Sequence, residues 1–336
     1  MKWTFFGGVV APVIAAALLV TSPAAAQPSG PVSVSEIAPR FYLLSDASSR
    51  LVLYAGEHGA MTAGVHSPGL VARARSVLRT SGAGPLRYAV LMEGDSAGTY
   101  SDPGWDAGTV TMTQELLYNR MRRRARAAAA AHPGSAPAKL PDLGFSQVVQ
   151  LYFDAEEVHL IHERPGHTNS DVIVHFEKAG IVYLGNSFTT DGYPAVDSAR
   201  GGTVAGLIAT ADFFVGAFAA QPATVEPVVP GRGPVATLAG LREYRDMLVS
   251  VRDRVQALRD AGKTLQEIVA ARPTATLDAR WGRGPVKPDE FVAMVYRSIG
   301  AERPAPAPAP APAPAAGGHV HGAPPPQPQP RPGAPD

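Results

Sequence analysis

The most constraining feature of the sequence lies between Gln147 and Asn186, where four short runs of strand-forming residues follow one another with tight turns between them. The acidic turn 154–157 joins the first two runs, and the turn 178–180 joins the last two. A single histidine, His167, stands in a Gly-His-Thr turn between the two pairs. This pattern predicts a strand-rich half-domain with His167 in the loop between two hairpins.

The first half of the chain shows a similar succession of strands followed by a helix. Strand-like runs at 40–46 and 49–65 resemble a hairpin with a Gly-containing turn at His58-Gly59, and a helix is expected at 67–82, beginning after Ser67. A buried-type strand at 86–95 then runs into an irregular loop. Loops at the carboxyl ends of strands are where α/β proteins tend to place functional groups.

Helical patterns follow each strand-rich half. They are expected in an Arg-rich stretch at 119–132, at 201–218 and, as an amphipathic helix, at 241–261. Two shorter helices have candidate N-caps at Thr264 and Asp289. Two strand-rich halves, each closed by helices, predict an α/β fold in which sheet packs on sheet with helices outside.

The two ends of the chain differ from the part between them. Residues 1–26 combine one lysine, an apolar run and a small-residue site ending at Ala26, which predicts a secretory signal peptide and an exported protein, periplasmic or extracellular. Residues 302–336 are rich in proline and alanine, which predicts a disordered tail. The folded domain is expected at 31–301, with a helical extension at 236–301.

Composition narrows the possible chemistry. The chain has no cysteine, so any metal must be held by His, Asp or Glu. The formal net charge of +1 becomes zero once Lys2 leaves with the signal peptide. A chain without net positive charge lacks the excess of basic residues that is typical of nucleic-acid-binding proteins. No membrane span is expected after that cleavage. In the tail, His319 and His321 could chelate a metal weakly, although two incidental histidines are the simpler interpretation.

The segment "ERPGHTNSDVIVHFEKAGIVYLGN", followed by "VVPGRGPV", resembles the metallo-β-lactamase-fold hydrolases, in particular exported single-domain members with a helical C-terminal extension. The resemblance extends from Ser35 to Ile299. It implies an αββα four-layer sandwich with one or two zinc ions at the sheet edges. In that family a metal-activated water attacks a β-lactam, lactone, thioester or similar bond.

The family's ligands come from an HxHxDH loop, a Gly-His-Thr turn, a Gly-Asp turn and a Pro-Gly-His-Gly turn. Carried over position by position, only one of them is retained in this chain. The corresponding residues are Glu93 and Asp95 for the first two histidines, Ala97 and Gly98 for the Asp-His pair, then His167, Asn186 and Arg232.

These replacements predict the loss of zinc chemistry. A catalytic zinc needs about three protein ligands and a water, but here one imidazole remains and Arg232 brings a permanent positive charge. Ala97 cannot orient an attacking water. The resemblance and the replacements together predict a non-catalytic pseudo-hydrolase without a cofactor. Its role would be binding a small molecule or a protein in the former active-site groove, or acting as a scaffold.

Two other interpretations of the same positions stay open. Arg232 could pair with Glu93 or Asp95 and fill the former metal position with an ion pair. Alternatively, Glu93, Asp95 and His167 could hold zinc or another divalent metal such as manganese or iron, in an active hydrolase of β-lactam, lactone or ester type.

The remaining histidines are weaker candidates for a metal or catalytic site than His167. His58 and His66 lie in turns and are expected at the surface, whereas His175 lies on a strand where a cross-strand polar contact is expected. His162 could join His167 only if the chain folds back at Gly166. A Ser-His-Asp site with Ser187 or Ser96 lacks a nucleophile-elbow sequence.

Overall fold

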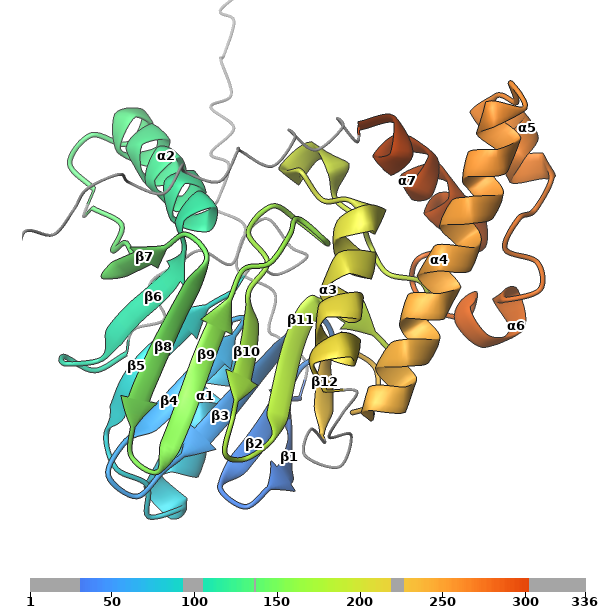
Figure 1. Cartoon of the computed structure of the whole chain (residues 1–336). Coiled ribbons are helices and arrows are strands. Elements are labelled where there is room, and N and C mark those ends of the chain that lie inside the picture. The colour runs from blue at the N-terminus through green and yellow to red at the C-terminus, as the bar shows by residue number, and fades with distance from the viewer. Residues whose placement is uncertain (1–30, 93–104, 136, 219–226, 302–336) are drawn as a thin grey trace, which may run out of the picture.

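The computed structural model describes residues 31–92, 105–135, 137–218 and 227–301 (Figure 1). The predicted signal peptide, the loop with Glu93, Asp95, Ala97 and Gly98, and the proline-rich tail lie outside these residues. Among the described residues, no helix combines the length and the apolar character needed to cross a bilayer.

Sheet A is built from the first half of the chain. Its strands lie side by side in chain order: β1 (Ser33–Ala38), β2 (Phe41–Ser45), β3 (Arg50–Ala55), β4 (Ala60–Gly64), β5 (Leu86–Leu91), β6 (Val110–Gln114) and β7 (Leu143–Phe145). The strands β1 to β4 pair in antiparallel fashion, and β4 to β7 are parallel. The helix α1 (Pro68–Thr80) connects β4 to β5 and α2 (Glu115–Ala131) connects β6 to β7, as crossovers between parallel strands.

Sheet B holds the hairpins predicted between Gln147 and Asn186. Its spatial order is β12 (Val228–Arg232), β11 (Ile181–Thr189), β10 (Ile173–Phe176), β9 (Glu156–Ile161) and β8 (Val148–Phe153). Pairing is antiparallel from β8 to β11, whereas β12 runs parallel to β11. A short 3-10 helix (Ser198–Arg200) and α3 (Val204–Ala217) connect β11 to β12.

Three apolar clusters separate four layers. One lies between the sheets, a second joins sheet A to α1 and α2, and the third joins sheet B to α3 and the C-terminal helices. Figure 1 shows α3 and α4 stacked on the β11 and β12 side of sheet B. The αββα arrangement expected from the sequence is therefore confirmed.

The C-terminal helices are α4 (Leu238–Asp260), α5 (Leu265–Ala270), α6 (Asp278–Trp281) and α7 (Pro288–Ala301). Thr264 caps α5 through a capping box with Glu267, as predicted. The N-cap predicted at Asp289 is wrong, because α7 already begins at Pro288 and Asp289 lies within its first turn. Proline suits a first helical position, where no intrahelical N–H bond is lost.

Candidate functional site

The Gly-His-Thr turn is organised by one buried carboxylate, Asp171. Its Oδ2 accepts hydrogen bonds from the backbone N–H groups of Gly166 (3.1 Å) and His167 (2.6 Å), and its Oδ1 accepts from the N–H of Thr168 (2.9 Å). The hydroxyls of Thr168 and Ser187 also donate to it, at 2.8 and 3.0 Å. Five donors around one carboxylate hold the loop in a single conformation.

The start of α3 packs directly on this turn. The backbone N–H of Thr203 donates to the Gly166 carbonyl at 2.8 Å, and the Thr203 hydroxyl donates to the Pro165 carbonyl at 2.8 Å. A Cβ at Gly206 would lie 1.6 Å from the Pro165 carbonyl oxygen, and one at Gly202 would lie 2.1 Å from the His167 oxygen. Only glycine permits this approach of helix to loop.

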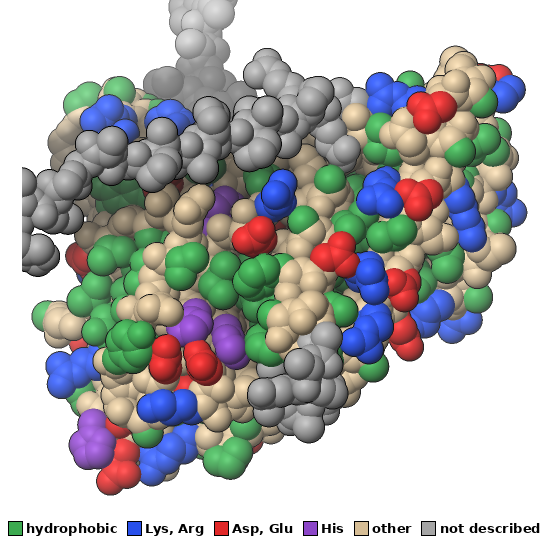
Figure 2. Space-filling model, in the orientation of Figure 1, with side chains coloured by type: hydrophobic (Ala, Val, Ile, Leu, Met, Phe, Trp, Pro, Cys, Tyr) green, Lys and Arg blue, Asp and Glu red, His purple; other side chains and the backbone are tan. Residues whose placement is uncertain are grey.

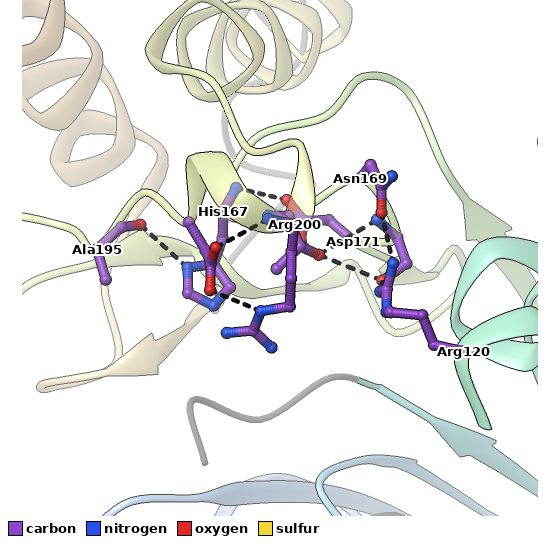
Figure 3. Close-up of polar contacts among 9 residues, drawn as sticks. Arg120, His167, Asn169, Asp171, Ala195 and Arg200 are labelled. Carbon is purple, nitrogen blue, oxygen red and sulfur yellow. Dashed lines mark hydrogen bonds and ion pairs between the residues drawn. The ribbon is translucent and has the colours of Figure 1, made fainter. Parts of the chain in front are cut away.

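The His167 ring is held from one side by backbone. Its Nδ1–H donates to the Ala195 carbonyl at 3.0 Å, and the residue is only 2% exposed (Figure 3). In the neutral ring Nε2 then carries the lone pair. His167, Asn186 and Arg232 line one small cavity of about 20 Å³, room for roughly one water molecule.

Arg232 forms an ion pair, but with a residue that sequence reasoning missed. Its Nε lies 3.1 Å from Oδ2 and 3.2 Å from Oδ1 of Asp191, which follows β11. The Thr189 hydroxyl donates to the same carboxylate at 2.6 Å. The pairing proposed with Glu93 or Asp95 involves residues outside the described part of the chain and stays a hypothesis.

A larger cleft of about 600 Å³ adjoins His167. Three arginines line it, Arg200 beside the 3-10 helix, Arg232 on β12 and Arg297 on α7, against one aspartate, Asp197. Arg200 Nε is 2.6 Å from Asp197 Oδ2. The apolar part of the wall comes from Ala195, Val196, Pro285, Val286 and Met294. The cleft therefore combines excess positive charge with an apolar wall.

No protein-family model matches the sequence, and no curated protein matches it either. Among solved structures, the stereoselective inverting sec-alkylsulfatase Pisa1 from Pseudomonas sp. matches with a TM-score of 0.60 and 13% identity, over 81% of this chain and 51% of that chain. A double mutant of the same sulfatase matches with a TM-score of 0.61, 11% identity, and 80% and 50% coverage. The DIM-1 metallo-β-lactamase matches with a TM-score of 0.48 and 14% identity, over 65% of this chain and 96% of that chain.

This chain has the metallo-β-lactamase fold. It spans about half the length of the alkylsulfatase structures that it matches. At these identities the likeness concerns the fold alone.

Three positions carried over from metallo-β-lactamase-fold proteins, His167, Asn186 and Arg232, come together around the small cavity. The described residues among them do not fit zinc: they supply one imidazole, one neutral amide and one permanent cation. Within the described residues, His167 belongs to no group of three His, Asp or Glu side chains close enough to share a metal. Glu93, Asp95, Ala97 and Gly98 lie outside the described residues.

The other histidines divide into exposed and buried ones. The His58 side chain is 83% exposed, as expected, but the surface position expected for His66 is wrong, because that residue is 5% exposed. His66 packs against the ring of Trp105, and its Nε2 lies 3.0 Å from the Thr62 hydroxyl. Burial lowers the pKa of His66 to about 4. His175 lies opposite His159 across β10 and β9, and the two rings meet edge to face; the polar contact predicted for His175 stays a prediction.

His162 and Ser187 both contribute to holding the turn. The His162 Nδ1–H donates to the backbone carbonyl of Asp171 at 2.8 Å, and Ser187 donates to the Asp171 carboxylate rather than to the ring of His167. The described residues therefore do not form a Ser-His-Asp relay around His167.

One arginine of the Arg-rich helix has a structural role. Most arginines of α2 are exposed, but Arg120 reaches the loop that follows His167 (Figure 3). Its Nη1 donates to the Asn169 side-chain oxygen at 2.6 Å, and its Nη2 donates to the Ser170 hydroxyl. No local pattern distinguishes Arg120 from its neighbours.

Two further residues of the site, Asp191 and Arg297, were not predicted from the sequence. Asp191 could have been suspected from its place after a strand, whereas Arg297 has no sequence signal that marks it as a site residue.

Proposed function

We propose that this metallo-β-lactamase-fold protein is a non-catalytic binding protein for a small amphiphilic anion, held in the cleft beside His167. The observation that carries the proposal is the lining of that cleft, with three arginines and His167 on one part and apolar side chains on another. A volume of about 600 Å³ lies within the range of about 300–1,000 Å³ typical of small-molecule sites.

The charges suit an anion with an acidic group such as a sulfate, phosphate or carboxylate. Arg200 and Arg232 are pre-oriented by Asp197 and Asp191, while Arg297 is exposed on α7. Guanidinium groups present planar pairs of donors that match such oxyanions. Val286 and Met294 would then contact an apolar tail.

Absence of hydrolysis is the second part of the proposal. It is supported by the guanidinium and the amide that stand beside His167 where the family has ligands. The proposed setting is the periplasm or the extracellular space, which follows from the leader-like sequence of residues 1–26.

Hexyl sulfate is a suitable probe, because it joins an anionic head to a short apolar tail and because one protein of similar fold is a sec-alkylsulfatase. Calorimetric titration should show binding of hexyl sulfate and much weaker binding of neutral 1-hexanol. Arg297→Ala should weaken hexyl sulfate binding by about tenfold or more, since a charge-assisted hydrogen bond contributes about 1.5–3 kcal/mol.

Arg73→Ala is the matched control, because it removes an exposed arginine from α1, which covers the other sheet. It should leave the affinity unchanged. Equal affinity for hexanol, or an unchanged affinity in Arg297→Ala, would show that the cleft is not the anion site.

An active hydrolase with an atypical metal set is the second candidate. The hydrogen bond from His167 Nδ1–H to the Ala195 carbonyl favours it, since metal-ligating histidines commonly donate their other N–H to such an acceptor. Release of inorganic sulfate from hexyl sulfate, abolished by His167→Ala together with about one equivalent of bound metal, would establish this candidate and refute the non-catalytic one.

A further inference from the structure

A second group of metal-ligating side chains lies on the outer face of sheet B. His159 on β9 stands directly opposite His175 on β10, and Glu157 and Glu177 each lie two residues from one of these histidines. Side chains two apart on a strand share a face. Figure 2 shows histidines and acidic side chains side by side on this face, over the strands β9 and β10 of Figure 1.

The face is separate from the inter-sheet core. The neighbours along the strands, Val158, Leu160, Val174 and Phe176, point to the opposite side and pack between the sheets. His167 and Arg232, by contrast, belong to the loop after β9 and to the end of β12. The outer group therefore shares no residue with the cleft described above.

The donor atoms of this group already converge. His159 Nε2 lies 3.0 Å from Glu157 Oε1 and 3.2 Å from Glu177 Oε2. One donor atom each from His159, His175 and Glu177 lie within 4.8 Å of one another. Zinc sits about 2.0–2.2 Å from nitrogen and carboxylate oxygen ligands, so small side-chain rotations would bring all three into a coordination sphere.

Packing restricts the two imidazoles. The His175 ring lies 5.2 Å from the ring of Phe218 at the end of α3 and 5.7 Å from the ring of His159, at an interplanar angle of 81° to the latter. His175 is 8% exposed, and the side chains of His159 and Glu177 are 18% and 50% exposed. The group is therefore partly ordered by its surroundings yet reachable from solvent.

Electrostatics favour a cation at this point. The backbone N–H of Glu177 donates to the Glu157 carbonyl at 2.9 Å, so the two carboxylates come from adjacent positions of paired strands. Like charges opposite each other across a sheet are destabilising. In the structure His159 bridges them with one nitrogen, and a divalent cation would neutralise them more fully.

We propose that His159, His175 and Glu177 bind a divalent transition-metal ion such as Zn²⁺, with Glu157 as a fourth ligand. Imidazole and carboxylate together suit zinc and its neighbours, whereas Mg²⁺ and Ca²⁺ prefer all-oxygen sites. On binding, the ion takes the Nε2 lone pair of the neutral His159 ring, whose single proton then lies on Nδ1, and it replaces the contacts of Nε2 to the two carboxylates. The ion would link β9 to β10 on the exposed face of the sheet.

Zn²⁺ titration of the full chain, after removal of metal by a chelator, tests the proposal. We expect the wild-type protein to bind about one Zn²⁺ ion per chain tightly. His159→Ala/His175→Ala should weaken it by more than about 100-fold, since loss of an outer-shell partner alone costs about 10- to 100-fold. His319→Ala/His321→Ala is the matched control, because it also removes two histidines, and it should leave the tight equivalent intact.

Glu177→Gln is a second test that does not depend on the folding of the double variant, because half of the Glu177 side chain is exposed and its replacement should disturb the fold little. Glu177→Gln should fold normally and also weaken Zn²⁺ binding. Mg²⁺ and Ca²⁺ should bind to no variant with an affinity comparable to that of Zn²⁺ for the wild-type protein. Loss of the tight equivalent only in His319→Ala/His321→Ala or only in His167→Ala would overturn the proposal, as would full Zn²⁺ affinity in Glu177→Gln. Hexyl sulfate binding should be unchanged in Glu177→Gln, so this proposal and the proposed function can fail separately.

Discussion

At the scale of single residues, the backbone around His167 depends on Asp171 more than on any feature of the histidine itself. Its carboxylate accepts from three consecutive backbone N–H groups and two hydroxyls, all in a buried loop. Because three consecutive backbone N–H groups donate to this one carboxylate, Asp171 fixes the backbone of the turn, and the Ala195 carbonyl then orients the His167 ring.

Asp171→Ala should lower the free energy of unfolding by about 3 kcal/mol or more, because each buried donor left without an acceptor costs about 1–3 kcal/mol. Urea unfolding followed by circular dichroism measures the change. Asp212→Ala removes an exposed aspartate that pairs with Arg245 and should cost less than about 1 kcal/mol. Similar losses in the two variants would mean that the Asp171 network adds nothing beyond a surface ion pair.

At the scale of elements, α3 sets the position of the His167 loop from outside. The helix begins where Thr203 and Gly206 meet the Pro165–Gly166 backbone, and the Ser298 hydroxyl of α7 accepts the N–H of Val204 at 2.8 Å. The loop, α3 and α7 thus form one packed unit, and α7 also supplies Arg297 to the cleft.

Two alanine substitutions within α3 should have opposite effects. Gly206→Ala forces a methyl group against the Pro165 carbonyl and should cost about 1–3 kcal/mol or more through a backbone shift. Gly216→Ala meets no atom within 4 Å and should stabilise the helix by up to about 1 kcal/mol. Thermal unfolding of the two variants gives the comparison, and a neutral Gly206→Ala would show that helix and loop are not in tight contact.

At the scale of the whole molecule, two buried histidines make stability depend on pH. Burial lowers the pKa of both His66 and His175 to about 4, below the value of about 6.5 expected in the unfolded chain. The unfolded state therefore takes up protons first as the pH falls. Their contribution is complete above about pH 6.5 and is lost progressively towards pH 4, at up to about 1.4 kcal/mol per pH unit for each histidine.

In a metal-free buffer with chelator, His66→Gln should reduce the slope of unfolding free energy against pH between about pH 6.5 and 4. The reduction should be up to about 1.4 kcal/mol per pH unit, the contribution of one histidine. His132→Gln removes an exposed histidine at the end of α2 and should leave the slope unchanged. Urea unfolding at several pH values measures the slopes, and equal slopes in His66→Gln and wild type would contradict the buried, neutral state of His66.

Local signals explain which elements could be predicted from the sequence. Ser67 and Thr264 cap α1 and α5 through bonds to residues three positions later, so each cap is visible within a few letters of sequence. The hairpins of sheet B are visible in the same way, because short turns separate their strands. His66 was misjudged because its burial depends on Trp105, which no local pattern connects to it.

From the sequence alone, the hairpins of sheet B, the principal helices and the Gly-His-Thr turn could be predicted, because each depends on neighbouring residues. The replacement of metal ligands at Asn186 and Arg232 follows from a resemblance and stays a prediction. The fold is what brings Arg232 to Asp191, places Arg297 of α7 in the cleft beside His167, and gathers His159, His175 and Glu177 on one sheet face. Those groups meet through strand pairing and helix packing, and their chemistry depends on distances that the order of residues does not contain.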